Sequence, residues 1–396
     1  MITSDALAAR LVGLADIGVR ADGVCRLAWS EEDAATRAWF EEQAGGAGLR
    51  VARDPAGNLW ACPEADPPWW GIGSHLDSVR GGGRFDGPLG VACGFAIADG
   101  VPRPVAVLSF ADEEGARFNT PTFGSKALSG RLDLPGVLDR PDDAGVRLGD
   151  AMREAGVDPD GIGEAPPWLG RLSGFIEIHI DQTTELAGAS EPVGVVTSLA
   201  AQTRLQAHLH GRADHAGTTP RSERRDALSA AARLIVAAEE IARAHPTLTV
   251  TTSRIIAQPN APTTIAAEVR LWIDARAPSF AAIDAWRSHL DERLRELEAC
   301  SGVEIDVSVA SRSDAREFSP ELRRKLIRAT EDVLGHAAPE LVCFAGHDAG
   351  VLAERVPAAM LLVRNPTGIS HSPAETVELE DAAIAAQVVA RAVEAA

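Results

Sequence analysis

The sequence predicts an α/β domain that is interrupted by a smaller α+β domain. At 396 residues the chain is too long for one compact core, because single cores stop growing near about 250 to 300 residues. The first half alternates short apolar strands with helical segments, and this alternation returns after Ser319-Pro320. Between residues 201 and 315 the pattern changes to half-exposed strands with two long helices.

The first half contains a well-marked helix and three buried strands. Ser30 begins a helix with acidic residues in its first turn, and Gly45-Gly46 ends it. The small residues from 90 to 98 suit a tightly packed helix. Apolar runs between turn residues predict strands at 58–61, 70–74 and 104–111. Open α/β sheets place their sites at the carboxyl ends of such strands, so polar residues there are candidates for function.

The segment that begins near residue 200 has the pattern of a separate unit. Residues 202–210 alternate polar and apolar side chains, as a half-exposed antiparallel strand does. Two long helices are expected at about 225–244 and 279–299. Further strands are expected at 249–256, 264–273 and 303–309. The sequence therefore predicts a small α+β unit at 201–315, inserted between 1–200 and 316–396.

Composition and charge are those of a globular protein. Hydrophobic residues at 45% and charged residues at 24% can form a core and are too balanced for disorder. A net charge of -19 argues against nucleic acid as a partner, because phosphates would be repelled. The 5 cysteines include no Cys-x-x-Cys pair, which favours a reducing cytoplasm over a disulfide framework or a thiolate zinc site. Without a signal peptide or an apolar run of about 18 residues, we expect a cytoplasmic protein that has no membrane partner.

Side chains that commonly bind metals gather in the loop from 73 to 91. His75, Asp77 and Asp86 follow an apolar run in this loop. Their spacing excludes a helix-face pair, which needs two histidines four residues apart. The loop itself must therefore bring Asp86 back to His75, with Asp77 left to orient the imidazole. Taken alone, a His-x-Asp loop is more often an ordinary polar surface.

Other histidines and acids follow apolar segments in the same way. The adjacent carboxylates Glu113 and Glu114 could have two different roles: one could bind a cation while the other takes a proton from water. In the strand around His179, alternation places Glu177, His179 and Asp181 on one face. Alone, each pattern could be a solvated turn or a satisfied core residue. A sheet would bring to one edge the candidates His75, Asp86, Glu113, Glu114, His179, His347 and His371.

Six motifs occur in order along the chain. They are Gly-Ser-His-Leu-Asp-Ser-Val with Gly-Gly-x-Phe-Asp-Gly-x-Leu-Gly-Val, Asp-Glu-Glu-Gly-Ala-Arg-Phe, His-Ile-Asp-Gln, His-Ala-Gly-Thr-Thr-Pro, Gly-His-Asp-Ala and Gly-Ile-Ser-His-Ser-Pro-x-Glu. Together they resemble the ureido-amidohydrolase branch of the M20 metallopeptidase family, and the match extends from about residue 30 to the C-terminus. That branch holds N-carbamoyl-L-amino-acid hydrolases, β-ureidopropionases and allantoate amidohydrolases.

The resemblance implies an architecture and a metal centre. Residues 1–200 and 316–396 would form a mixed-sheet hydrolase domain, and 201–315 would form a lid and dimerisation domain in a homodimer. Two divalent ions would be bound, and the nitrogen and oxygen ligands suit Zn or Mn, with Co or Ni also possible. Asp86 would bridge the ions, Glu114 would bind one and His179 the other, and the terminal ligands would be His75 and His371.

The resemblance also implies catalytic and substrate-binding residues. Glu113 would be the general base and Asp77 the partner of His75. His215 would stabilise the tetrahedral intermediate and also bind substrate, together with Gln182, Asn260 and Arg276. A guanidinium pairs well with a substrate carboxylate. From the residues alone, a surface ion pair of Arg276 with Asp274 or Asp284 is the simpler interpretation.

The substrate side of the site departs from the family pattern. Asp181 and Thr183 stand where the family has Glu and Gly, and Arg221 stands where Met is common. Residues 263–266 also differ from the usual Asn-Val-Ile-Pro. The predicted activity is metal-dependent hydrolysis of a non-peptide C–N bond in a small carboxylate substrate, an N-carbamoyl-L-amino acid or allantoate. The alternatives are a peptidase or N-acyl amino acid deacylase of the same family, and a non-catalytic binding protein, which would need a lost ligand or base.

Overall fold

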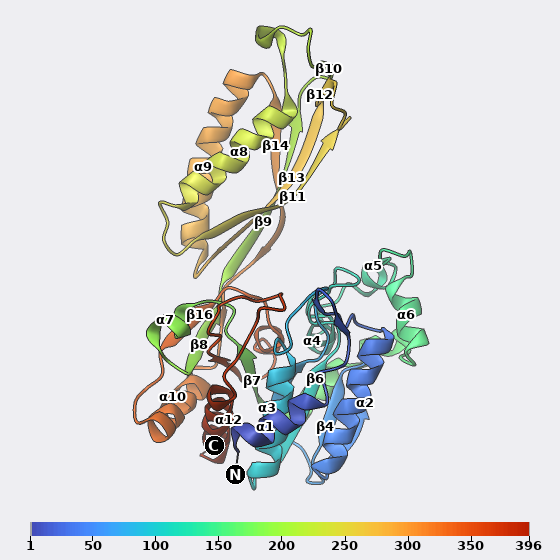
Figure 1. Cartoon of the computed structure of the whole chain (residues 1–396), viewed down its shortest axis with the longest axis vertical. Helices are drawn as coiled ribbons and strands as arrows, with labels where there is room; N and C mark the ends of the chain where they lie inside the picture. The colour runs from blue at the N-terminus through green and yellow to red at the C-terminus, as the bar shows by residue number, and fades with distance from the viewer. Residues whose placement is uncertain (1, 396) are drawn as a thin grey trace. The chain divides into compact units, whose positions relative to one another are not determined.

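The computed structural model describes residues 2–395, and the chain divides into two compact units (Figure 1). The large unit comprises Met1–Thr197, Glu317–Leu341 and Ala345–Ala396. The small unit comprises Ser198–Arg316 with Val342–Phe344. The predicted fold class, an α/β chain interrupted by a smaller α+β unit, is confirmed.

A nine-stranded mixed sheet forms the centre of the large unit, in the order β15-β8-β17-β7-β5-β6-β4-β3, with β16 paired to β8. Strands β6, β5, β7 and β17 are parallel neighbours, whereas β3, β4 and β8 run antiparallel to their partners. The four parallel strands therefore direct their carboxyl ends to the same edge of the sheet. The strands are β3 Arg50–Arg53, β4 Leu59–Cys62, β5 Trp69–His75, β6 Val105–Phe110, β7 Leu172–Ile180, β8 Val193–Leu199, β15 Arg316–Glu317, β16 Glu340–Cys343 and β17 Ala358–Val363.

Several of the helices of the large unit contact this sheet. The predicted helix start at Ser30 is confirmed, because the Ser30 side chain accepts a hydrogen bond from the Asp33 amide. The helices are α1 Ser4–Val12, α2 Glu31–Gly46, α3 Pro88–Gly100, α4 Phe123–Ser129, α5 Leu134–Leu138, α6 Leu148–Glu154, α7 Glu185–Ala189, α10 Pro320–Leu334, α11 Asp348–Leu352 and α12 Leu379–Glu394. Two 3-10 helices at Pro159–Glu164 and Pro166–Arg171 and a short hairpin of β1 Val19–Arg20 and β2 Gly23–Val24 complete the unit.

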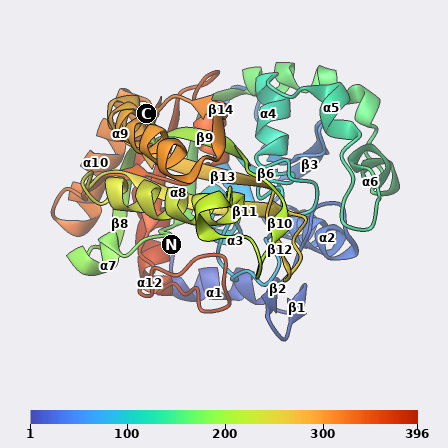
Figure 2. The same cartoon turned by 90° about the horizontal axis from the view of Figure 1, so that it is seen from above.

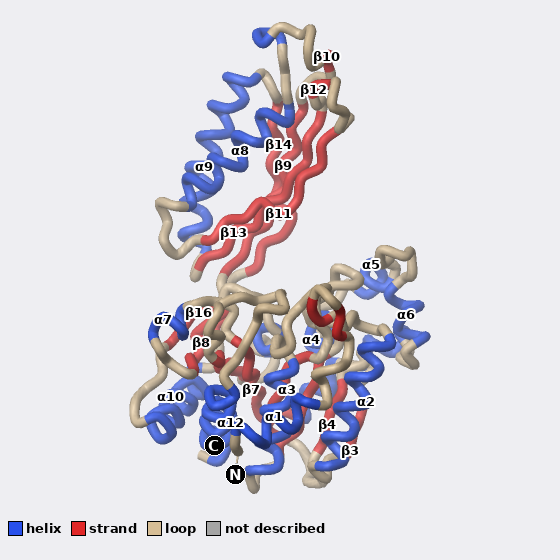
Figure 3. Tube along the Cα trace, in the orientation of Figure 1, coloured by secondary structure: helices blue, strands red, loops and turns tan. Residues whose placement is uncertain are grey.

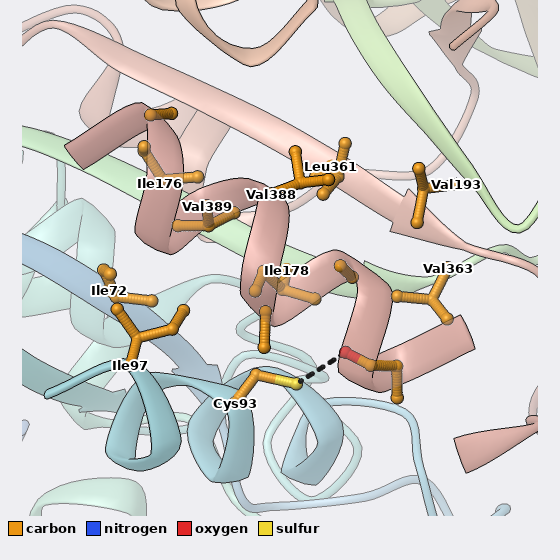
Figure 4. Close-up of a cluster of buried hydrophobic side chains, with 14 of the residues drawn as sticks. Ile72, Cys93, Ile97, Ile176, Ile178, Val193, Leu361, Val363, Val388 and Val389 are labelled. Carbon is orange, nitrogen blue, oxygen red and sulfur yellow. Dashed lines mark hydrogen bonds between the residues drawn. The ribbon is translucent and has the colours of Figure 1, made fainter. Parts of the chain in front are cut away.

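One apolar cluster joins segments that are distant in the sequence. Ile72 of β5 and the isoleucines of β7 pack with residues of β8, β17, α3 and α12 (Figure 4). The isoleucines Ile176, Ile178 and Ile180 face this core, whereas Glu177 and His179 lie on the opposite face of β7, as the alternation predicted. Cys93 of α3 is buried here and donates from Sγ to the Ala382 carbonyl of α12 over 3.8 Å.

The small unit is a four-stranded antiparallel sheet, in the order β11-β13-β9-β14, with two helices on one face (Figure 3). Helices α8 Ala227–Ala242 and α9 Phe280–Ser301 lie side by side (Figures 1 and 2). Its strands are β9 Ala201–His210, β11 Thr249–Gln258, β13 Glu268–Ala277 and β14 Glu304–Ser313, with a two-stranded pair of β10 Asp214–His215 and β12 Thr264–Ile265 and a 3-10 turn at Arg221–Glu223.

One strand prediction in the small unit was wrong. The run 264–273, predicted as one strand, contains β12 and the first part of β13. Thr264 and Ile265 pair with β10, whereas β13 pairs with β9 and β11. The amides of Ala227 and Gly211 bond to the carbonyls of Ala266 and Ala267 between the two strands.

No helix within residues 2–395 has the length and apolarity needed to cross a membrane.

Candidate active site

The carboxyl ends of the parallel strands in the large unit carry the predicted site residues. His75 is the last residue of β5, and Glu113 and Glu114 follow β6 by three and four positions. His179 lies one residue before the end of β7. The loop after β17 carries His371, whose backbone has φ 55°, in the left-handed region that histidine rarely adopts. Parallel strand direction therefore accounts for the meeting of the side chains from β5, β6 and β7, whereas His371 reaches them through a loop.

Asp86 lies at the centre of two groups of ligand atoms. Its Oδ1 is 3.4 Å from His75 Nε2 and 3.1 Å from His179 Nε2. Its Oδ2 is 3.6 Å from His371 Nε2, which is 3.4 Å from Glu114 Oε2. Within each group all ligand atoms lie within 4.8 Å of one another. The five predicted metal ligands are thus brought together, with one oxygen of Asp86 in each group.

The loop that presents Asp86 is held by a residue near the end of the chain. Glu375 Oε1 accepts hydrogen bonds from the amides of Phe85 (2.8 Å) and Asp86 (3.0 Å). Gly87 has φ 88°, and a Cβ there would lie 2.5 Å from the His75 ring. Only glycine therefore combines this backbone conformation with the close approach of the imidazole.

Asp77 connects His75 with the two acidic residues. Its carboxylate accepts from the Glu113 amide at 3.2 Å and from the Glu114 amide at 3.1 Å. Its backbone carbonyl accepts a hydrogen bond from His75 Nδ1 at 3.1 Å, and its Oδ1 lies 3.6 Å from the same nitrogen. Glu113 is buried, and its Oε2 is 3.9 Å from His75 Nε2. Asp77 therefore fixes both the imidazole and the backbone from which Glu113 projects.

The charges of the site strongly perturb one another. Burial raises the pKa of Glu113 well above its usual value, and the nearby Asp348 and Glu114 add to the effect. Burial and Asp86 raise the pKa of Glu114 to about 8. Burial disfavours charged His179, but Asp86 outweighs it and raises the pKa of His179 to about 9. Burial likewise disfavours ionised Asp86, yet the two histidines beside Oδ1 hold its pKa well below the usual range.

The donor set fits divalent cations. His75 Nε2 is buried and has no hydrogen-bond partner among residues 2–395. Imidazole nitrogens and carboxylate oxygens are the ligand types of zinc and related metals. Carboxylates that are crowded and buried repel one another, and cations between them would relieve that repulsion.

Gln182, predicted to bind substrate, contacts a metal-ligand candidate. Its Nε2 donates to Asp86 Oδ2 over 3.0 Å, and Ser370 Oγ donates to the same oxygen over 3.1 Å. Next to it, Asp181 accepts from the amide and hydroxyl of Thr183, both at 2.9 Å. The two departures from the family pattern, Asp181 and Thr183, thus bond to each other in one local turn.

Three buried residues beside the site had no predicted role, although His347 was among the candidates for the sheet edge. The His347 ring lies 4.3 Å from that of His179, and neither His347 nitrogen has a hydrogen-bond partner within residues 2–395. Burial, with the charge of His179, lowers the pKa of His347 well below its usual value. Asp348 is buried and accepts from Ser125. The third is Glu375. All three lie in the quoted motifs Gly-His-Asp-Ala and Ser-Pro-x-Glu, which were the available signal.

The remaining predicted residues belong to the small unit. His215 is exposed in β10, and its Nδ1 accepts from the amides of Gly217 (3.0 Å) and Thr218 (3.1 Å). The proton of the neutral ring must then lie on Nε2, which becomes a donor. Asn260 is exposed after β11 with φ 51°.

Arg276 forms one of the two ion pairs considered from the sequence. Its Nε donates to Asp274 Oδ1 over 2.8 Å, and its Nη1 donates to the Phe344 carbonyl over 2.5 Å. Asp284 pairs with Arg312 instead, at 3.0 Å. The guanidinium is therefore held in a fixed orientation inside the small unit.

Comparison with known proteins identifies the family. The model of peptidase family M20/M25/M40 matches residues 71–395. The chain belongs to this family. It is 34% identical to an N-carbamoyl-L-amino acid amidohydrolase of Geobacillus stearothermophilus, over 98% of this chain and 97% of that protein. It is 30% identical to an allantoate amidohydrolase of Escherichia coli (strain K12), over 92% of this chain and 90% of the relative.

A solved structure supports the same relationship. An amidase of the hydantoinase/carbamoylase family from Burkholderia multivorans superposes with a TM-score of 0.85 and 30% sequence identity. The match covers 99% of this chain and 97% of the other. The family predicted from the six motifs is therefore confirmed.

Proposed function

We propose that the protein is a metal-dependent amidohydrolase that cleaves a non-peptide C–N bond of a small carboxylate substrate, an N-carbamoyl-L-amino acid or allantoate. The observation that carries the proposal is the pair of nitrogen and oxygen donor groups that share Asp86, with the buried carboxylate of Glu113 beside them. The named activities of the two relatives, both amidohydrolases of this bond type, support the substrate class.

Five residues would hold two ions. His75, Asp86 and His179 form one group, and Asp86, Glu114 and His371 form the other. Zinc or manganese, with cobalt or nickel as further candidates, would polarise the scissile carbonyl and lower the pKa of water when bound. Gln182 and Ser370 restrain Asp86 from the side opposite the histidines of the first group.

Glu113 is assigned as the general base. It belongs to neither donor group, so its carboxylate is available to accept a proton from attacking water and to pass it to the leaving nitrogen. Its raised pKa, caused by burial and neighbouring carboxylates, suits a group that must both take and release a proton. Asp77 acts as a positioning residue through the Glu113 amide and the His75 ring.

Substrate binding is assigned to Gln182, His215, Asn260 and Arg276 from the family pattern. The Nε2 proton of His215 suits donation to the oxyanion of a tetrahedral intermediate. The fixed guanidinium of Arg276 suits a carboxylate. The small unit would serve as lid and dimerisation domain of a homodimer. The free cysteines support a cytoplasmic location.

The experiment is steady-state hydrolysis after reconstitution with Zn, Mn, Co or Ni. The panel contains N-carbamoyl-L-amino acids, allantoate, dipeptides and N-acyl amino acids. We expect turnover of a ureido substrate, and Glu113→Gln serves as the matched inactive control. Turnover of dipeptides or N-acyl amino acids alone would replace the proposal with the peptidase or deacylase alternative.

A further inference from the structure

The sheet of the small unit carries a second cluster of metal-ligand side chains. His208 and His210 lie on β9, two residues apart and therefore on the same face of the sheet. The alternate residues of β9, such as Leu205 and Leu209, are buried among the residues of α8 and α9. The two imidazoles consequently project from the face that the helices leave uncovered.

Strand register gathers two carboxylates around these imidazoles. In β13 Glu268 lies opposite His210, and in β14 Asp306 lies opposite His208. The side chains reach diagonally across the strands, so that His208 Nε2 is 3.5 Å from Glu268 Oε2 and His210 Nε2 is 3.7 Å from Asp306 Oδ2. The two rings are 3.8 Å apart between centroids. Three elements thus direct two nitrogens and two carboxylates to one place.

The cluster has an unsatisfied donor or acceptor at its centre. His208 Nε2 is shielded from solvent, and within the described part of the chain it has no hydrogen-bond partner. A buried nitrogen normally has a partner, because losing water without replacement is unfavourable. Ligand atoms of His208, His210 and Glu268 all lie within 4.8 Å of one another, a separation that small side-chain rotations can close around an ion.

We propose that this cluster is a binding site for one divalent transition-metal ion, with His208, His210 and Glu268 as ligands and Asp306 oriented toward His210. Two imidazoles and one carboxylate select zinc, nickel or copper over magnesium and calcium, which prefer sites made only of oxygens. Water would complete the coordination, because the His208 and His210 side chains are 33% and 37% exposed. Arg270 lies opposite His208 in β13, and its positive charge disfavours a bound cation nearby. The negative charges of the carboxylates are needed to offset this repulsion.

Bound metal would cross-link β9 to β13 in the small unit. A ligand that binds only the folded state stabilises it in proportion to the logarithm of its concentration. The site lies on residues that have no part in the proposed hydrolysis. Its loss should therefore leave turnover unchanged, and its presence can be tested without measuring turnover.

The test is histidine labelling with diethyl pyrocarbonate on the full chain, read residue by residue by peptide mass spectrometry. Zn²⁺ is titrated from about 1 µM to about 1 mM. We expect labelling of His208 and His210 to fall about fivefold or more, because coordination removes the reactive lone pair. His289 is the matched control residue. It is exposed and lies near another histidine, His245, with ring centroids 6.0 Å apart, but within residues 2–395 neither histidine belongs to a group of three possible metal ligands.

Variants identify the ligands. Glu268→Gln keeps both imidazoles but removes the charged ligand. The Zn²⁺ concentration that half-protects His208 from labelling should therefore rise about tenfold. His210→Gln should remove one equivalent of bound Zn²⁺ per chain in equilibrium dialysis, whereas His289→Gln should remove none. Labelling of His208 that is unchanged by Zn²⁺, or equal metal content in His210→Gln and the unsubstituted protein, would overturn the proposal.

Discussion

Replacement of Asp77 by asparagine tests how the candidate active site is held. The Asp77 carboxylate accepts one hydrogen bond each from the Glu113 and Glu114 amides and lies beside His75 Nδ1. Asparagine keeps the size but offers one oxygen and one NH2 group. In Asp77→Asn one backbone amide therefore faces another donor. His75 loses the negative charge beside Nδ1 but keeps its hydrogen bond to the backbone carbonyl of residue 77.

The expected magnitude follows from these contacts. A buried amide left without an acceptor costs about 1 to 3 kcal/mol. Changing a residue that supports a metal-binding histidine typically lowers metal affinity or activity by about 10- to 100-fold, equivalent to about 1.4 to 2.7 kcal/mol. We therefore expect Asp77→Asn to lower both Zn²⁺ affinity and kcat/KM by a factor in this range.

The assay is competition for Zn²⁺ against a chromophoric chelator, with kcat/KM measured on the same samples. Asp112→Asn is the matched control, because Asp112 is similarly buried, but among the side chains of residues 2–395 it bonds only to Thr120 Oγ1. Burial, with the charge of Asp77, raises the pKa of Asp112 to about 8, so it is mainly protonated at neutral pH and asparagine can replace it. Wild-type metal affinity in Asp77→Asn, or an equal loss in Asp112→Asn, would refute the reasoning.

Three further predictions test the proposed function. Glu113→Gln should lower kcat by about 100- to 10,000-fold with unchanged metal content by elemental analysis, and retained turnover would exclude Glu113 as the base. Because cations bind neutral imidazole and Asp86 raises the pKa of His179 to about 9, metal uptake should release protons and Zn²⁺ affinity should weaken as pH falls below about 9. Titrations at several pH values check this, and a pH-independent affinity would contradict it. Arg276→Lys should raise KM about tenfold or more while kcat changes little, because lysine keeps the charge and loses the planar fork; an unchanged KM would remove Arg276 from the substrate site.

Part of the site could be predicted from the sequence because its residues follow strongly apolar strands. The run before Glu113 and the alternation around His179 each identify a strand and the face or end that carries the polar group. Parallel pairing then brings those ends together without further information. The family motifs added the roles of the individual residues, which periodicity alone does not contain.

The rest of the site depends on contacts between distant segments. Glu375 holds the Asp86 amide from 289 residues away, and no local pattern indicates that pairing. The alternation over 202–210 predicted a strand with one polar face, but the sequence does not indicate which residues of β13 and β14 lie opposite His208 and His210. The break between β12 and β13 was missed for the same reason, since it is set by pairing with β10.

The position of β17 in the central sheet has a consequence for the synthesis of the protein. Strand β17 lies between β7 and β8, yet it follows the whole small unit in the chain. While a ribosome makes residues 200 to 357, the neighbouring edges of β7 and β8 have no partner, and unpaired edges invite association with other chains. His371 and Glu375 emerge later still. A nascent chain can thus complete most of its small unit early, but it acquires a full set of candidate metal ligands only after β17 has also been made.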